Sequence, residues 1–120
     1  MSDIEKIIDI IITVRKKIKD DTDVVWAGYD SPTELQVEID SNLKELQNGN
    51  LDKLDTFKNH FLPTATFQEV SLSNGWGDEL IKLAEEYDKL YEKLKKNNSQ
   101  HTTMAIHNKG FIAKLKNWFS

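Results

Sequence analysis

Apolar residues recur at helical spacing along this chain, and this periodicity is what most constrains its fold. The clearest stretch is residues 2–18, where isoleucine and valine mark one face of a helix. Ser2 and Glu5 have the spacing of a capping box, which satisfies free backbone N–H groups at a helix start. The residues of the face are Ile4, Ile7, Ile8, Ile11, Val14 and Ile18. Ile10 and Ile12 widen it, so we expect this helix to be central or covered on two sides.

Two further helices are predicted from their boundary residues. Residues 31–34, Ser-Pro-Thr-Glu, place an N-cap serine, a first-turn proline and a glutamate at the third helical position, and Gly49 ends that helix. Asn50 can cap the next helix at once, and Pro63 stops it. Because the link is so short, we expect the two helices to pack as antiparallel neighbours. Their apolar faces are Leu35, Ile39, Leu43 and Leu46 on the first and Leu51, Leu54, Phe57 and Phe61 on the second.

The region after Pro63 is predicted to contain one short and one long helix. Residues 64–72 alternate in part like a strand, but Phe67 and Val70 suit a short helix, which is our interpretation. A long helix is expected at about residues 78–96, with acidic residues in its first turn and lysines in its last. Residues 97–103 are expected to be a polar linker. The inward positions of the long helix are Leu80, Leu83, Ala84, Tyr87, Leu90, Tyr91 and Leu94.

Charge divides the chain into two parts of one domain. Residues 1–98 hold all 20 acidic residues and 13 of the 16 basic ones, a net charge of −7, whereas residues 99–120 contain three lysines and no acid. We therefore expect an acidic helical body at 1–98, followed by a linker and a basic amphipathic segment at 99–120. The predicted fold class is all-α, a small helical bundle of four main helices plus a C-terminal amphipathic helix. The net charge of −4 for the whole chain argues against nonspecific nucleic-acid binding.

The C-terminal segment carries an apolar stripe that needs a surface to cover it. Phe111, Leu115 and Trp118 follow the helical spacing i, i+4, i+7. This C-terminal interaction face could dock on its own acidic body or on a second copy, lie on an anionic membrane, or fill a groove on another protein. We expect docking on the body or on a copy. The body has the opposite net charge, and burial of the apolar stripe would stabilise the contact more than exposed ion pairs do.

Composition excludes several kinds of site. The chain has no cysteine, which rules out disulfides, thiolate metal sites and cysteine nucleophiles. The apolar run at residues 7–12 contains Asp9 and lacks the basic start of a secretion signal. No stretch reaches the roughly 20 apolar residues of a membrane-spanning helix. We therefore expect a cytoplasmic protein.

Two tryptophan loops are the best candidate site. Residues 26–30, Trp-Ala-Gly-Tyr-Asp, and residues 75–78, Gly-Trp-Gly-Asp, each combine an aromatic, a glycine and an acid just before a predicted helix. A tryptophan face can bind a sugar, a base or a cation, and helix N-termini attract anions. The alternative, which we favour, is a structural clamp, in which Trp76 packs on Ile81 and Trp26 plugs the core. The candidate ligand- or partner-binding residues are Trp26, Tyr29, Asp30, Trp76 and Asp78.

No catalytic, metal or cofactor set is assigned. The histidines lack metal-ligand spacing, and no serine lies in a nucleophile-elbow pattern. A pairing of His60 with Glu69 stays open, and the acidic residues at 78–88 are interpreted as a solvated face. The function we expect is non-enzymatic binding of another protein, as in a small adaptor, inhibitor or toxin-neutralising protein. The alternative is a small-molecule-binding protein or enzyme that uses the Trp26 and Trp76 loops.

Overall fold

Helices are the only regular secondary structure over the residues that the computed structural model describes, 2–105, with side chains described up to residue 96. Five α-helices and one short 3-10 helix are present, and no strand occurs within that range, which confirms the predicted all-α class. The elements are α1 (Asp3–Lys17), η1 (Val25–Ala27), α2 (Pro32–Gln47), α3 (Lys53–Phe61), α4 (Thr66–Ser73) and α5 (Gly77–Ala105). Within this part of the chain, no helix has the length and apolar character needed to cross a membrane.

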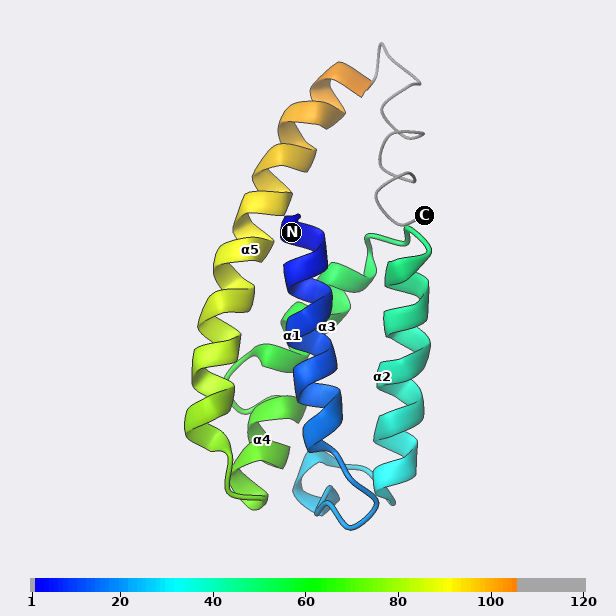
Figure 1. The fold of residues 1–120 in the computed structure, drawn as a ribbon, viewed down its shortest axis with the longest axis vertical. Coiled ribbons are helices and arrows are strands. Elements are labelled where there is room, and N and C mark those ends of the chain that lie inside the picture. The colour runs from blue at the N-terminus through cyan, green and yellow to red at the C-terminus, as the bar shows by residue number, and fades with distance from the viewer. Residues whose placement is uncertain (1, 106–120) are drawn as a thin grey trace.

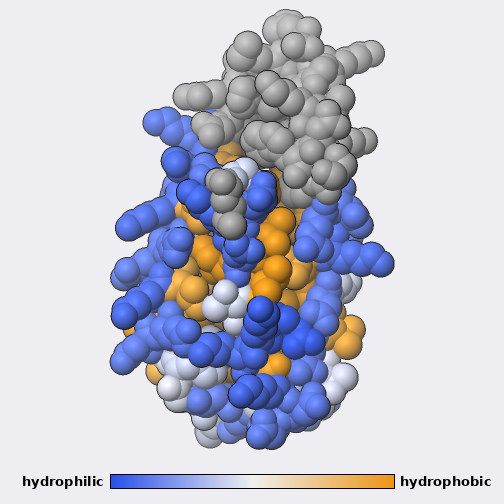
Figure 2. All heavy atoms as spheres, in the orientation of Figure 1, coloured by the Kyte–Doolittle hydropathy of each residue, from blue (hydrophilic) through white to orange (hydrophobic). Residues whose placement is uncertain are grey.

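Helix α1 lies between α2 and α5, and contacts both (Figure 1). The amide of Glu5 donates to the hydroxyl of Ser2 (3.2 Å), and that hydroxyl donates to the Glu5 carboxylate (3.1 Å), so the predicted cap forms. Its broad apolar face is buried as expected, at Ile4, Ile7, Ile10, Ile11 and Val14. On the face seen in Figure 2, hydrophilic side chains cover the helix surfaces and apolar ones gather in the seams between helices. Burial on two sides therefore makes α1 the central helix.

The link between α2 and α3 is longer than the boundary residues indicated. Helix α2 begins as predicted, with the Ser31 hydroxyl accepting from the Glu34 amide (3.4 Å), and Gly49 follows it with a φ of +100°. The prediction that Asn50 is the N-cap of the next helix is wrong, because α3 begins only at Lys53. The Asn50 side chain accepts from the Asp52 amide (3.2 Å) and so closes a turn between the helices. The two helices nevertheless pack on each other, as predicted for neighbours in the chain.

The short helix predicted after Pro63 is confirmed as α4, which packs on α3, α5 and η1. The long helix is confirmed in type but continues nine residues beyond its expected end, to Ala105, so the linker predicted at 97–103 is wrong. The reason is that the stretch is polar but contains neither glycine nor proline to end a helix. Figure 1 shows α5 running past the N-terminus of α1. The predicted C-terminal face of Phe111, Leu115 and Trp118 lies outside the described residues.

Aromatic packing joins α3, α4 and α5. The ring of Phe61 stacks on Tyr87 with centroids 4.6 Å apart and meets the edge of Phe67 at 4.9 Å. Tyr87 is fully buried, and its hydroxyl donates to the carbonyl oxygen of Leu54 (2.7 Å). The buried hydroxyl is thereby satisfied, which removes the cost of a buried polar group without a partner. These contacts hold the first half of α5, and with it the α4–α5 turn, against the rest of the core.

Candidate functional site

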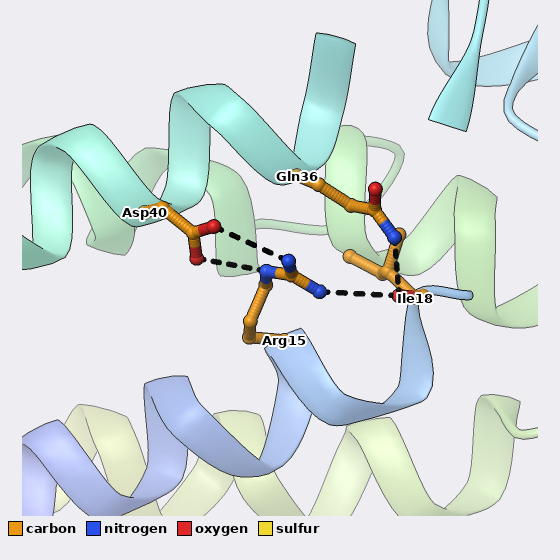
Figure 3. A network of polar contacts seen from close by, with 4 residues as sticks. All are labelled: Arg15, Ile18, Gln36 and Asp40. Atoms are coloured by element: carbon orange, nitrogen blue, oxygen red, sulfur yellow. Dashed lines mark hydrogen bonds and ion pairs between the residues drawn. The ribbon is translucent and has the colours of Figure 1, made fainter. Parts of the chain in front are cut away.

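The loop that carries Trp26 is anchored where it leaves α1. Arg15 forms a two-pronged ion pair with Asp40 of α2, at 2.8 and 3.2 Å (Figure 3). The carbonyl oxygen of Ile18 accepts from Arg15 (3.3 Å) and from Gln36 (3.0 Å). Four residues later, the hydroxyl of Thr22 accepts from the amide of Lys19 (2.7 Å). The end of α1 and the start of the loop are thus held on α2.

Asn74, at the end of α4, binds the middle of this loop. Its side-chain oxygen accepts from the Asp23 amide (3.0 Å), and its side-chain nitrogen donates to the Asp23 carbonyl oxygen (2.8 Å). The same nitrogen also donates to the carbonyl oxygen of Val70 within α4 (2.8 Å). One amide side chain therefore pairs with the loop backbone as a neighbouring strand would. Asp23 and Asn74 are 51 residues apart in the sequence. Their pairing brings the two predicted tryptophan loops to the same end of the molecule.

Tyr29 ties the other end of the loop to α2. Its hydroxyl donates to the carboxylate of Glu38. Burial, with a further contribution from Glu38, raises the pKa of Tyr29 to about 12, so the phenol stays protonated as a donor at neutral pH. Gly28, just before it, has a φ of +86°, a conformation that glycine adopts without a Cβ clash. Tyr29 therefore acts as an anchor of the loop, with its ring half-buried.

His60 of α3 faces the same carboxylate. Its Nε2 atom lies 3.8 Å from Glu38, and its ring centroid lies 5.1 Å from that of Phe67. The sequence left open a pairing of His60 with Glu69, but in the structure His60 faces Glu38 instead. The position of Glu38 within its helix did not by itself mark it as a partner. Burial lowers the pKa of His60, and the opposing effect of Glu38 is smaller. The imidazole is therefore neutral at pH 7, and the Tyr29–Glu38–His60 cluster joins the loop, α2 and α3.

This burial predicts a pH dependence of stability. In the unfolded chain a histidine titrates near its usual pKa of about 6.5. Below that pH, the unfolded chain takes up a proton that the folded chain, with its lowered His60 pKa, does not bind. Stability should therefore fall as the pH drops from about 6.5 toward the folded pKa, and level off below it. Urea unfolding at pH values across this window should show the loss in the wild type and a flatter profile in His60→Gln. Identical profiles in the two proteins would contradict this assignment.

The anchored loop leaves its apolar tip in water. Val25 and Trp26 of η1 are 72% and 75% exposed, and Leu72 of α4 and Ile81 of α5 are 62% and 50% exposed. Leu72 lies over Gly77, where an added Cβ would come within 3.0 Å of it, and Ile81 follows one helical turn later. Because η1 packs on α4 and α4 packs on α5, these three elements meet at the lower end of the molecule in Figure 1. We call the exposed apolar side chains of these three elements, Val25, Trp26, Leu72 and Ile81, the η1–α4–α5 surface.

The two tryptophans have opposite environments. The interpretation of Trp26 as a core plug is wrong, because Val24 takes the buried position and the 3-10 turn directs the next two side chains outward. Trp76 instead packs against the core, its backbone amide donates to the Ser71 carbonyl oxygen (2.9 Å), and its buried indole nitrogen has no hydrogen-bond partner. Of the other candidate residues, Asp30 and Asp78 are exposed.

Acidic residues predominate in the segments that meet at this end of the molecule. Residues 18–34 and 66–86 contain ten acidic residues and two lysines, a net charge of −8, whereas the rest of residues 1–98 sums to +1. One of these charges is paired, since Lys17 of α1 lies 2.6 Å from Glu79. The predicted solvated face is exposed at Asp78, Glu79, Glu85, Glu86 and Asp88. Among the described residues, no group of three or more side chains is arranged to hold a metal ion.

The positions of Leu72 and Ile81 on this surface were missed by sequence reasoning. A signal for Ile81 was present, since it lies off the inward positions of its helix.

Comparisons with protein-family models, with curated proteins and with solved structures found no match for this chain.

Proposed function

We propose that this chain is a small, non-enzymatic, cytoplasmic protein-binding domain of the adaptor, inhibitor or toxin-neutralising type. The observation that carries the proposal is Trp26, which is 75% exposed although its loop is held at both ends. Tryptophan is among the residues that contribute most to protein interfaces, and a rigid position lowers the entropy lost on binding. Exposed apolar side chains gathered at one end are typical of an interaction site.

The charge around the surface indicates the chemistry of the partner. A net charge of −8 over the neighbouring segments favours a cationic ligand and disfavours an anionic one. The adjacent exposed side chains Val25 and Trp26 suit a ligand that presents its own apolar stripe. A cationic amphipathic helix combines both properties. We therefore propose that the η1–α4–α5 surface binds such a helix.

The alternative, a small-molecule site between the two tryptophans, has less support. Such a site would need both indole faces to line one pocket. Trp26 lies largely in solvent, whereas Trp76 packs on the core. The difference favours Trp26 as an interface anchor and Trp76 as a structural residue.

A synthetic peptide tests the proposal. The probe is a fluorescently labelled amphipathic helix of leucine, tryptophan and lysine, unrelated in sequence to this chain, and its anisotropy is measured as protein is added. We expect binding that weakens with salt, and a loss of about tenfold or more in affinity for Trp26→Ala, equivalent to about 1.4 kcal/mol. Val37→Ala is the matched control, because Val37 is 61% exposed but lies on α2.

Two results would contradict the proposed function. One is equal affinity of the wild type and Trp26→Ala for the peptide. The other is equal binding of a peptide in which glutamate replaces every lysine, since the acidic surround should repel it.

A further inference from the structure

The sign of the charge reverses along α5 and the residues that follow it. The segment 66–86, at the η1–α4–α5 surface, carries a net charge of −4, whereas residues 87–120 contain seven lysines and two acids, a net charge of +5. Helix α5 begins at the acidic end of the molecule and ends beyond the N-terminus of α1 (Figure 1). The acidic surface thus lies near the start of one long helix, and the basic C-terminal region follows the end of that helix.

The C-terminal segment has the chemistry that the surface requires. Residues 106–120 carry three lysines and no acid, and Phe111, Leu115 and Trp118 have the spacing of an apolar helical stripe. As a helix, this segment would have the cationic and amphipathic character that the proposed function requires of a ligand.

Distance prevents that segment, as a helix, from reaching the surface of its own chain. From Ile81 to Ala105, α5 rises about 36 Å, at about 1.5 Å per residue. The fifteen residues after Ala105 span only about 22 Å as a helix. Even with the residues up to Gly110 fully extended, at about 3.4 Å each, and the rest helical, the reach is roughly 32 Å. A helical stripe that covers the η1–α4–α5 surface must therefore come from another molecule.

We propose, building on the proposed function, that residues 106–120 of one copy bind the η1–α4–α5 surface of a second copy. In this arrangement the stripe of Phe111, Leu115 and Trp118 covers Trp26, and Lys114, which flanks the stripe on a helical wheel, lies toward the acidic residues around it. The contact joins two different surfaces, so a dimer held by one such contact keeps one free surface and one free segment, whereas a reciprocal exchange of segments uses both. Such a contact produces either a closed ring or a growing chain of copies.

Two full-length variants test this arrangement. The surface variant is Trp26→Ala with Leu72→Ser, both at exposed positions, and the segment variant is Leu115→Glu with Trp118→Glu. Sedimentation velocity should show concentration-dependent assembly of the wild type and a monomer for each variant alone. An equimolar mixture of the two variants should form a dimer and nothing larger, because it contains only one intact surface and one intact segment per pair. Val37→Ala should assemble like the wild type, and melting curves check that each variant is folded.

Three results would overturn the inference. These are a monomeric wild type at about 100 μM, assembly of either variant alone, or a mixture that stays monomeric. If the unrelated cationic peptide still binds the wild type, the proposed function stands and only the self-association is wrong. If the wild type stays monomeric but sediments with anionic and not with neutral vesicles, the segment binds membranes instead.

Discussion

Replacing Phe57 with alanine should lower the free energy of unfolding by about 3–5 kcal/mol. Phe57 is fully buried in α3, and its ring meets the edge of His60 with centroids 6.4 Å apart. Removing the ring leaves a cavity where α3 faces the core, and a close-packed interior closes such a cavity only in part. Urea denaturation measures the loss, with the same dependence of the unfolding free energy on urea concentration used for both proteins.

Leu43→Ala is the matched control for this substitution. Both residues lie on predicted core faces, but Leu43 is only partly buried. We therefore expect a smaller loss, about 1–2 kcal/mol. Equal losses at the two positions would mean that the degree of burial of a side chain does not predict how much it contributes to stability.

Trp76→Ala should lower the free energy of unfolding by about 2–4 kcal/mol and the melting temperature by several degrees. The indole of Trp76 packs against the core between α4 and α5, so its loss removes apolar contacts from that junction. The range lies below the cost for a fully buried ring, because part of Trp76 is exposed.

Trp26→Ala provides the contrast, since the same side chain is lost from an exposed position. We expect its melting temperature to stay within about a degree of the wild type, because surface substitutions usually change stability by less than about 0.5 kcal/mol. The clamp role of Trp76 is refuted if Trp76→Ala melts like the wild type. A large drop for Trp26→Ala would show that Trp26 supports the fold and is not free to bind a partner.

Local signals were sufficient to locate most of the helices. The caps at Ser2 and Ser31 lie where the structure starts α1 and α2, and Pro63 follows the last residues of α3. Most residues of the faces predicted for α1 and α3 are buried, whereas Ile8 and Leu51 are partly buried. These signals act within one or two turns of backbone, so a single sequence contains all the atoms involved.

Helix ends without a strong stop signal were harder to predict. The polar residues after Lys96 resemble a linker in composition, yet α5 continues to Ala105. Side-chain polarity by itself does not end a helix, because the backbone hydrogen bonds continue until a residue disfavours the helical conformation. The start of α3 was also predicted too early. The Asn50 side chain closes the turn after Gly49, and α3 begins only after that turn.

The sequence by itself determined the helical class, most helix starts, the charge asymmetry and the two tryptophan loops as candidates. Only the tertiary structure decided that Trp76 packs on the core while Trp26 lies in water. That outcome depends on Asn74 holding Asp23, and on Glu38 binding Tyr29, contacts between residues that lie on different elements. Both tryptophans lie close to a glycine in a loop, so local spacing cannot distinguish them. Which ring is buried depends on the neighbours that packing brings to it, and here Val24 fills the core position that Trp26 could have taken.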